Sequence, residues 1–343
     1  MINFILGLFS YDLAIDLGTA NTLVYVRGKG IAIRENTAVA RSKRARETLA
    51  IGSAASKMLG KTGKSIEVVR PLRAGVISDY SAAAVLLTHF IHKVHQSGTF
   101  HPRIPRPRVV IGIPSSINEV ERKAVREVAL KAGARKVYLV PETVAAAAGV
   151  IKNFSLESVA AVIDVGGGTT DIALISSGRE VESVSLRTAG DKMDADIIEF
   201  VKLRYSLLIG EPTAERTKIA LADARPAKDV FQVIRGRDLE SGLPRSVKIS
   251  NFEIYNALKS SFDEIVEASV ALFEGAPPEL ISDIMQSGVI LSGGGALIKN
   301  LDVVLSQALN IKVKLAEDPL TAVVRGCAKL LSDRPLLKKV SHV

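Results

Sequence analysis

The stretch Asp16-Leu17-Gly18-Thr19-Ala20-Asn21-Thr22 recurs 148 residues later as Asp164-Val165-Gly166-Gly167-Gly168-Thr169-Thr170. The aspartate, the first glycine and the last threonine keep the same spacing, and each copy lies between two apolar runs. This pattern predicts a tight turn between two strands, twice. Glycine lets backbone N–H groups approach phosphate oxygens, and an aspartate supplies a hard oxygen near a divalent cation. We therefore expect two turns that face each other across a cleft and bind a nucleoside triphosphate with Mg²⁺.

A third glycine cluster, Ser292-Gly293-Gly294-Gly295-Ala296, follows the apolar run 289–291 and precedes the amphipathic segment 297–309. This order predicts a strand, a glycine turn and a helix. Any one of the three clusters is compatible with an ordinary glycine-rich loop. Three of them, each at the end of an apolar run, favour a binding site.

Four further segments carry a resemblance to a known family: VPETVAAAAG at 140–149, AGDKMD at 189–194, IGEPTAERTK at 209–218 and DPLTAVVRG at 318–326. Together with the glycine turns, the chain resembles the actin, sugar-kinase and heat-shock-chaperone ATPase superfamily, and within it the MreB family of bacterial actins. The resemblance implies a duplicated α/β fold of the actin-like ATPase type. Two large α/β domains, each with a smaller insertion, would hold the nucleotide in the cleft between them.

The domain boundaries follow from this order of segments. The first domain is predicted over 11–152 with an insertion at about 33–67, and the second over 153–343 with an insertion at about 191–251. The last segment, about 318–343, is expected to pack back onto the first domain.

Periodicity supplies individual elements within this frame. Apolar residues at helical spacing predict helices over 81–94, 116–132 and 252–273, and a continuous apolar run predicts a buried strand over 108–114.

The composition excludes several classes of protein. With 343 residues, 47% hydrophobic and 24% charged, the chain is long enough for two globular domains. It has no apolar stretch near the roughly 18–20 residues that span a bilayer. A single cysteine, Cys327, and the lack of a signal-peptide pattern favour the cytoplasm. The net charge of +9 favours an anionic partner, but no aromatic residues are interleaved with the basic ones, so no nucleic acid is expected.

Glu142 is the candidate for orienting the attacking water in hydrolysis. It follows a predicted strand over 136–140 and opens the alanine-rich helix 143–149, so its carboxylate can point into a cleft. Alternatively, an acid at this position only complements the helix dipole, which contributes about 0.3–1 kcal/mol. The resemblance favours the catalytic role, with the Thr169 hydroxyl as its companion.

The cofactors implied are ATP and Mg²⁺. Asp16 and Asp164 are expected to bind the metal, one from each domain and through water, because Mg²⁺ keeps several waters. Glu215 and Lys218 share one helix face. By resemblance they contact adenosine, whereas the alternative is a surface ion pair. The predicted nucleotide-binding residues are Gly18, Thr19, Ala20, Asn21, Gly166, Gly167, Gly168, Thr169, Thr170, Glu215, Arg216, Thr217, Lys218, Gly293, Gly294, Gly295, Ala296 and Leu297.

One motif is misleading. Gly60-Lys61-Thr62-Gly63-Lys64-Ser65 ends like a Walker A loop, but Met58 occupies the position of its first glycine and no buried strand precedes it. We interpret the segment as a surface loop. By resemblance a lysine nearby contacts the nucleotide, yet this chain has Ser56-Lys57 where the family usually has Lys-Gln, so the role of Lys57 stays open.

Residues 1–10 are predicted to form an amphipathic membrane anchor. Six large apolar residues cover most of a helix, three turns of which can enter an interface but cannot span a bilayer. The alternative is a segment packed on the core. The loop after His95 adds two more candidates. The predicted membrane residues are Ile2, Phe4, Ile5, Leu6, Leu8, Phe9, Phe100 and Ile104.

The resemblance implies a cytoplasmic ATPase that forms filaments on the inner face of the cytoplasmic membrane and organises cell-wall elongation and rod shape. Its partners would be further copies of itself, RodZ, MreC, MreD and the elongation synthases. The rival functions are a sugar or acetate kinase and a chaperone ATPase. Neither is favoured, because we identify no sugar-binding carboxylate motif and no segment for a peptide-binding domain after the last ATPase motif.

Overall fold

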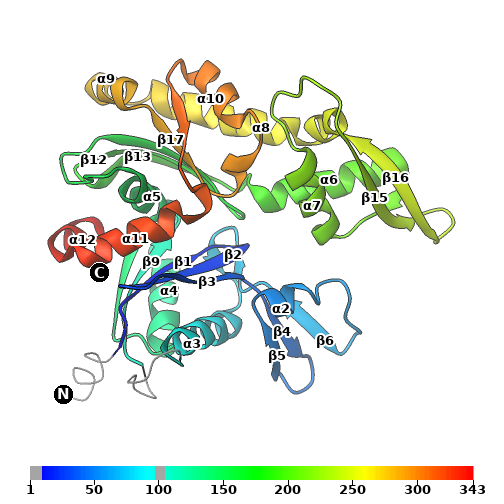
Figure 1. Ribbon diagram of the computed structural model, residues 1–343, viewed down its shortest axis with the longest axis horizontal. Coiled ribbons are helices and arrows are strands. Elements are labelled where there is room, and N and C mark those ends of the chain that lie inside the picture. The colour runs from blue at the N-terminus through cyan, green and yellow to red at the C-terminus, as the bar shows by residue number, and fades with distance from the viewer. Residues whose placement is uncertain (1–9, 97–104, 343) are drawn as a thin grey trace.

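The computed structural model describes residues 10–96 and 105–342, which form two five-stranded sheets (Figure 1). The predicted membrane residues between 2 and 9, together with Phe100 and Ile104, lie outside the described part of the chain. The first sheet has the order β10-β9-β1-β2-β3, built from β1 (Leu13–Leu17), β2 (Asn21–Val26), β3 (Gly30–Asn36), β9 (Arg108–Ile113) and β10 (Lys136–Pro141). The second has the order β13-β12-β11-β17-β18, built from β11 (Ala160–Val165), β12 (Thr170–Ser176), β13 (Arg179–Leu186), β17 (Val289–Ser292) and β18 (Val313–Leu315).

The two sheets have the same topology. In each, the first strand pairs antiparallel with the second and parallel with the fourth, and the fourth pairs parallel with the fifth. A register shift interrupts the antiparallel pairing of the second and third strands in both sheets. The duplicated α/β fold predicted from the repeated motif is therefore confirmed, with one motif at the turn β1–β2 and the other at β11–β12.

Helices cover both faces of the sheets, which explains why the central strands are continuously apolar. All six residues of β9 and of β11 are buried. On the outer face of the first sheet, α3 (Tyr80–Gln96) and α4 (Glu119–Lys131) contribute Leu86, Phe90 and Val128 to its core. Asn118 caps α4 in a capping box with Glu121, as expected for its polar start. On the outer face of the second sheet, α8 (Asn251–Glu274), α9 (Pro278–Ser287) and α10 (Leu301–Leu309) form the equivalent layer.

Two helices lie between the sheets and are exchanged between the halves (Figure 1). Helix α5 (Glu142–Val150) follows the first sheet but packs on β11 and β12, and α11 (Ala322–Ser332) follows the second sheet but packs on β1 and β9. Their axes approach closely because both carry glycine where they meet. A Cβ on Gly149 would lie 2.2 Å from the Ala322 carbonyl oxygen, and one on Gly326 would lie 1.7 Å from that of Ala145.

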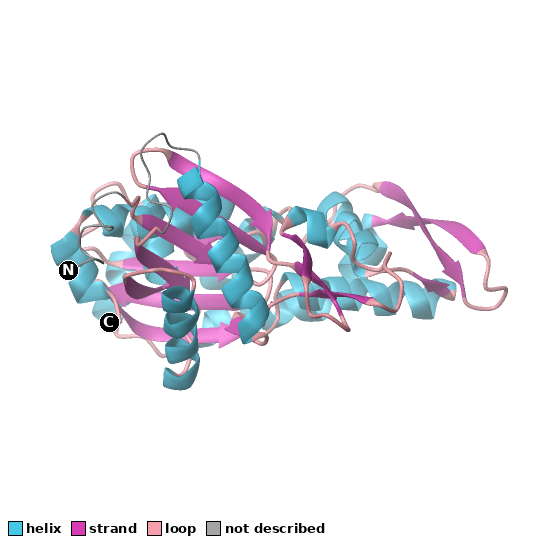
Figure 2. Cartoon of the chain, turned by 90° about the horizontal axis from the view of Figure 1, so that it is seen from below, coloured by secondary structure: helices cyan, strands magenta, loops and turns pink. Residues whose placement is uncertain are grey.

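Two smaller sheets extend from the large ones. The first, in the order β5-β4-β6, contains β4 (Val39–Ser42), β5 (Thr48–Ile51) and β6 (Ile66–Val69), with the short helix α2 (Ser53–Ser56). The second, in the order β14-β15-β16, contains β14 (Leu207–Leu208), β15 (Phe231–Asp238) and β16 (Pro244–Ser250), next to α6 (Gly190–Tyr205) and α7 (Glu211–Leu221). The β15–β16 hairpin projects at one end of the long axis (Figures 1 and 2).

The remaining elements are short. They are the hairpin β7 (Leu72–Arg73) and β8 (Val76–Ile77), the 3₁₀ turns η1 (Gly295–Leu297) and η2 (Pro319–Thr321), and α12 (Arg334–Val340). Among the helices that the structure describes, none is both long and apolar enough to cross a bilayer.

One predicted helix start is wrong, and the first large sheet extends a few residues past the start of the predicted insertion. The first sheet continues through Asn36, because β3 pairs with β2, so residues 33–36 belong to the large sheet. The helix predicted from residue 297 begins at Leu301. Tertiary contacts interrupt it, since Lys299 bridges to Asp223 and the Asn300 amide donates to the Asp223 carboxylate at 2.7 Å.

Candidate functional site

The two repeated turns touch each other at the junction of the halves. A Cβ on Gly167 would lie 2.8 Å from the Ala20 Cβ, and one on Gly168 would lie 2.3 Å from the Thr19 Oγ1. Thr19 is buried, and its hydroxyl accepts a hydrogen bond from the Gly75 N–H at 3.0 Å. Glycine is therefore required at positions 167 and 168, where the second turn packs against the side chains of the first.

Asp16 and Asp164 lie at equivalent positions, at the end of the central strand of each sheet. Burial raises the pKa of Asp16 to about 7. Burial, with the charges of Asp16 and Asp171, raises the pKa of Asp164 to about 8. Their mutual repulsion shows that the two carboxyl groups converge from the two halves.

Glu142 opens α5 and faces the same space. Burial, followed by the charges of Asp16, Asp171 and Asp164, raises its pKa well above the ordinary value. Gly112 on β9 makes room for it, because a Cβ there would lie 3.3 Å from the Glu142 Cγ and 2.9 Å from a Val323 methyl group. The structure thus brings Glu142 together with both aspartates.

Asp171 is a further acid of this site that the sequence analysis missed. It lies on β12, directly across the ladder from Asp164, and is 1% exposed. Its carboxylate accepts from the Thr169 hydroxyl and from the Ser115 N–H, the latter at 3.0 Å. An acid inside the otherwise apolar run of β12 was the available signal, because a buried carboxylate needs a specific partner.

The third glycine cluster packs against the end of β11. Gly293 has a positive φ of 84°, and a Cβ on it would lie 2.3 Å from the Asp164 Oδ1, so glycine is required there on two grounds. A Cβ on Gly295 would lie 2.3 Å from a Val165 methyl group, and one on Gly294 3.4 Å from Leu320. Ala296 is buried, whereas Leu297 is 52% exposed.

Lys218 is connected to the second glycine turn by hydrogen bonds through Gly190 at the start of α6. Its ammonium group donates to the Gly190 carbonyl at 2.7 Å and pairs with Asp194 at 2.9 Å. The Gly190 N–H donates to the Gly166 carbonyl at 3.1 Å. The alternative of a surface ion pair between Lys218 and Glu215 is therefore wrong, because Lys218 turns inward to Asp194 while Glu215 is exposed.

Several side chains that were predicted to bind nucleotide form hydrogen bonds with other groups of the protein. The Thr217 hydroxyl donates to the carbonyl of Thr213, and Arg216 donates to the hydroxyl of that same residue at 3.0 Å. The Thr170 hydroxyl donates to the Thr188 carbonyl at 2.7 Å. Asn21 is exposed and accepts from the Asn36 amide at 3.1 Å. The contacts of these four residues with nucleotide stay predictions.

The segment that resembles a Walker A loop lies in the turn between α2 and β6, where a Cβ on Gly60 or Gly63 would have open space around it. Lys57 is exposed. The prediction of a surface loop is confirmed.

The site fits a Mg²⁺ ion with few protein ligands. Asp164 is buried and Asp16 is half-buried, and within the described part of the chain neither carboxyl group has a cationic partner. A divalent cation would supply the missing positive charge. Within the described residues no group of three or more His, Cys, Asp or Glu side chains is arranged to bind a metal. Coordination mainly by water and phosphate, which Mg²⁺ tolerates, is consistent with this.

The two halves, their exchanged helices and the paired turns define an actin-like fold. The structure matches that of MreB5 of Spiroplasma citri bound to ADP with a TM-score of 0.88 and 37% sequence identity, over 95% of this chain and 97% of that one. A second structure of that protein, bound to AMPPNP, matches equally well. The MamK double helical filament matches with a TM-score of 0.79 at 21% identity, which supports the fold alone.

Sequence comparison gives the family. The family model described as MreB/Mbl protein matches residues 10–339. The cell shape-determining protein MreB of Escherichia coli is 45% identical over 330 residues, covering 95% of this chain and 94% of that protein. The cell shape-determining protein Mbl of Bacillus subtilis is 43% identical over 333 residues, covering 97% and 99%. The chain therefore belongs to the MreB/Mbl family.

Proposed function

We propose that this protein binds and hydrolyses ATP with Mg²⁺ and forms filaments on the inner face of the cytoplasmic membrane that organise cell-wall elongation and maintain rod shape. The observation that carries the ATPase is the convergence of Asp16, Asp164 and Glu142 on the contact between two glycine turns. Structures of a family member bound to ADP and AMPPNP support the choice of nucleotide.

The site residues divide the work of hydrolysis. Backbone N–H groups of the turns around Gly18 and Gly167 would bind phosphate oxygens. Asp16 and Asp164 would hold Mg²⁺ through water, and the ion would supply positive charge to the phosphates. Glu142, whose pKa burial and the neighbouring acids raise well above the ordinary value, would orient the water and accept its proton. The buried thiol of Cys327, whose pKa burial raises, takes no part.

The proposal of filaments rests on membership of the MreB/Mbl family and on the actin-like fold, which the MamK filament subunit shares. Head-to-tail contacts between identical subunits give an open polymer when the repeat does not close. A nucleotide held by both halves would favour one arrangement of the halves, and so one geometry of the subunit ends.

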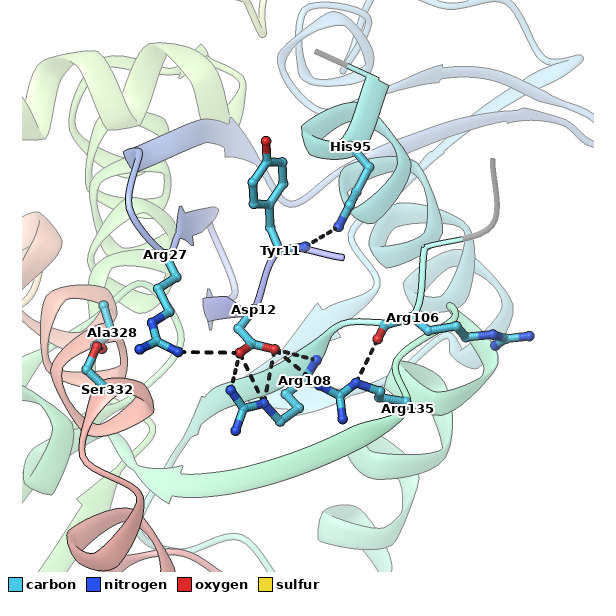
Figure 3. A network of polar contacts seen from close by, with 9 residues as sticks. All are labelled: Tyr11, Asp12, Arg27, His95, Arg106, Arg108, Arg135, Ala328 and Ser332. Atoms are coloured by element: carbon cyan, nitrogen blue, oxygen red, sulfur yellow. Dashed lines mark hydrogen bonds and ion pairs between the residues drawn. The ribbon is translucent and has the colours of Figure 1, made fainter. Parts of the chain in front are cut away.

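The described residues that flank the two candidate membrane segments lie together at one end of the first sheet (Figure 3). The Arg106 N–H donates to the Ser10 hydroxyl at 2.8 Å, and the Tyr11 N–H donates to the His95 Nε2 at 3.0 Å. Asp12 fixes this end, because it pairs with Arg108 and with Arg135 at 3.7 Å. The described residues next to segments 2–9 and 97–104 are therefore hydrogen-bonded neighbours, which supports the proposal that both segments contact a membrane.

Pelleting and phosphate release test the proposal. Purified protein with Mg²⁺ and ATP should release phosphate, scatter light above a critical concentration and show filaments by electron microscopy. It should cosediment with anionic lipid vesicles, and deletion of residues 2–9 should abolish this while nucleotide binding remains. A monomer that phosphorylates a sugar or a carboxylic acid would instead identify a kinase. RodZ, MreC, MreD and the elongation synthases are the partners to test by co-purification.

A further inference from the structure

A second polar cluster joins the two halves behind the hydrolytic acid. It consists of Glu180 on β13, Ser115 after β9, and Thr143, the second residue of α5. The Ser115 hydroxyl donates to the Glu180 Oε1 at 2.6 Å, and the Thr143 hydroxyl donates to the same oxygen. We name these three residues the Glu180 junction.

The junction connects segments that are distant in sequence and belong to different halves. Ser115 and Glu180 are 65 positions apart, and Thr143 and Glu180 are 37 apart. A parallel link lies beside it, since the Ser115 N–H donates to Asp171 at 3.0 Å. Asp171 and Glu180 thus bind the end of β9 and the first turn of α5 to the second sheet.

The Glu180 junction affects the position of Glu142, which directly precedes Thr143. Thr143 is fully buried and follows Glu142 directly in the first turn of α5. Pro141 at the helix start provides no side-chain cap, so this turn is held from outside by the Thr143 contact. A shift of Thr143 therefore moves the Glu142 backbone and changes the direction of its carboxylate.

The cost of burying Glu180 argues that the contact has a role. Burial raises the pKa of Glu180, the Ser115 and Thr143 hydroxyls lower it, and the charge of Asp171 raises it again. A carboxyl group placed in this position loses hydration next to another acid, and the two hydroxyl donors offset only part of that loss.

Resting on the ATPase proposed above, we infer that Glu180 is a positioning residue for Glu142: it accepts the Ser115 and Thr143 hydroxyls, so that Glu142 is aligned only when the two halves are closed on each other. Hydrolysis then depends on closure, whereas binding of nucleotide to the glycine turns does not. Small displacements of a catalytic group reduce turnover strongly, because reaction requires close alignment.

The test compares Glu180→Ala, Glu180→Gln and Thr143→Val with the control Glu182→Ala, an exposed acid on the same strand. Glu180→Ala should lower kcat about 10-fold while KM and the Kd for AMPPNP change less than about 2-fold. Glu180→Gln should retain most activity, because its amide oxygen accepts the same hydroxyls. Adding Thr143→Val to Glu180→Ala should cause no further loss, and Glu182→Ala should equal the parent.

Several outcomes would overturn the inference. A folded Glu180→Ala variant with parental kcat would do so, as would a Glu180→Gln variant as impaired as Glu180→Ala. If Glu180→Ala does not fold, Thr143→Val and Ser115→Ala, which each delete one hydroxyl, must show the same selective loss of kcat. If the parent itself hydrolyses no ATP, the proposed function fails. Hydrogen exchange then tests separately whether the Glu180 junction holds the first turn of α5. The first turn of α5 should exchange faster in Thr143→Val, and an unchanged rate would contradict the inference.

Discussion

The two glycine turns have the same topology but different surroundings. In the first half, the residue opposite Asp16 across the hairpin is Leu23, whereas in the second half Asp171 is opposite Asp164. The exchanged helices also differ, because α5 begins with the half-buried acid Glu142 and α11 begins with Ala322. The two halves therefore share the glycine turns but differ in the acids around them.

Removing the acid at the start of α5 should remove one difference between the two halves and most of the ATP turnover. Glu142→Gln should lower ATP turnover about 10² to 10⁴-fold, because a positioned general base contributes that much. AMPPNP binding should persist, since both glycine turns remain. Phosphate release at saturating ATP measures the effect, and turnover equal to the parent would exclude Glu142 from the mechanism.

The contact between the exchanged helices should be sensitive to a single methyl group. Gly326→Ala places a Cβ against the Ala145 carbonyl oxygen and should cost about 2–3 kcal/mol of the free energy of unfolding. Gly149→Ala should cost somewhat less, because its Cβ would lie 2.2 Å from the nearest atom instead of 1.7 Å.

The control for both is Gly63→Ala, where a Cβ would have open space. It should change stability by less than about 0.5 kcal/mol. Urea unfolding compares the three variants. Equal stability of Gly326→Ala and Gly63→Ala would show that the helices separate easily.

Asp164 should destabilise the protein when no nucleotide is bound. Because burial raises the pKa of Asp164 from 3.8 to about 8, the folded state holds a proton that the unfolded state releases between these values. Stability should therefore fall as the pH rises from about 4 to about 8. Asp164→Asn should remove much of this dependence and stabilise the protein at pH 8 by roughly 1–2 kcal/mol.

Urea unfolding at the two pH values checks the sign, and Mg²⁺-dependent nucleotide binding should be weakened in the same variant. A variant less stable than the parent at pH 8 would contradict the assignment. So would a variant that binds ATP with Mg²⁺ as tightly as the parent.

Substitution of Asp318, the acid that precedes α11, should have the smallest effect on stability and turnover. Asp318 is partly exposed and lies 3.8 Å from Arg34 and 3.7 Å from Arg325, distances and exposure typical of weak surface pairs. Asp318→Ala should change stability by less than about 1 kcal/mol and turnover by less than about 2-fold. A large loss of turnover would mean that the second half also contributes an acid to hydrolysis, and the asymmetry would then be incomplete.

The residues at the turns were predictable because their signal is local. Asp16, Asp164, the glycines and Glu142 each follow an apolar strand, and strand ends with glycine are recognisable within a few positions. Asp171 and Glu180 were not found, because their partners come from other segments. The prediction for Glu215 and Lys218 was also incomplete, because Lys218 forms its ion pair with Asp194, 24 positions earlier.

The sequence by itself determined the duplication, the α/β class and the two phosphate turns, since apolar periodicity and glycine act over a few residues whatever the rest of the chain does. The domain boundaries and the roles of the site residues remain predictions that experiments on the protein must test. Tertiary structure alone decided that α5 packs on the second sheet and that Ser115, Thr143 and Glu180 meet, whereas the packing of the last segment on the first domain was already expected. These contacts depend on which faces the sheets present to each other, and a carboxylate becomes a buried acid only when distant segments exclude water from it.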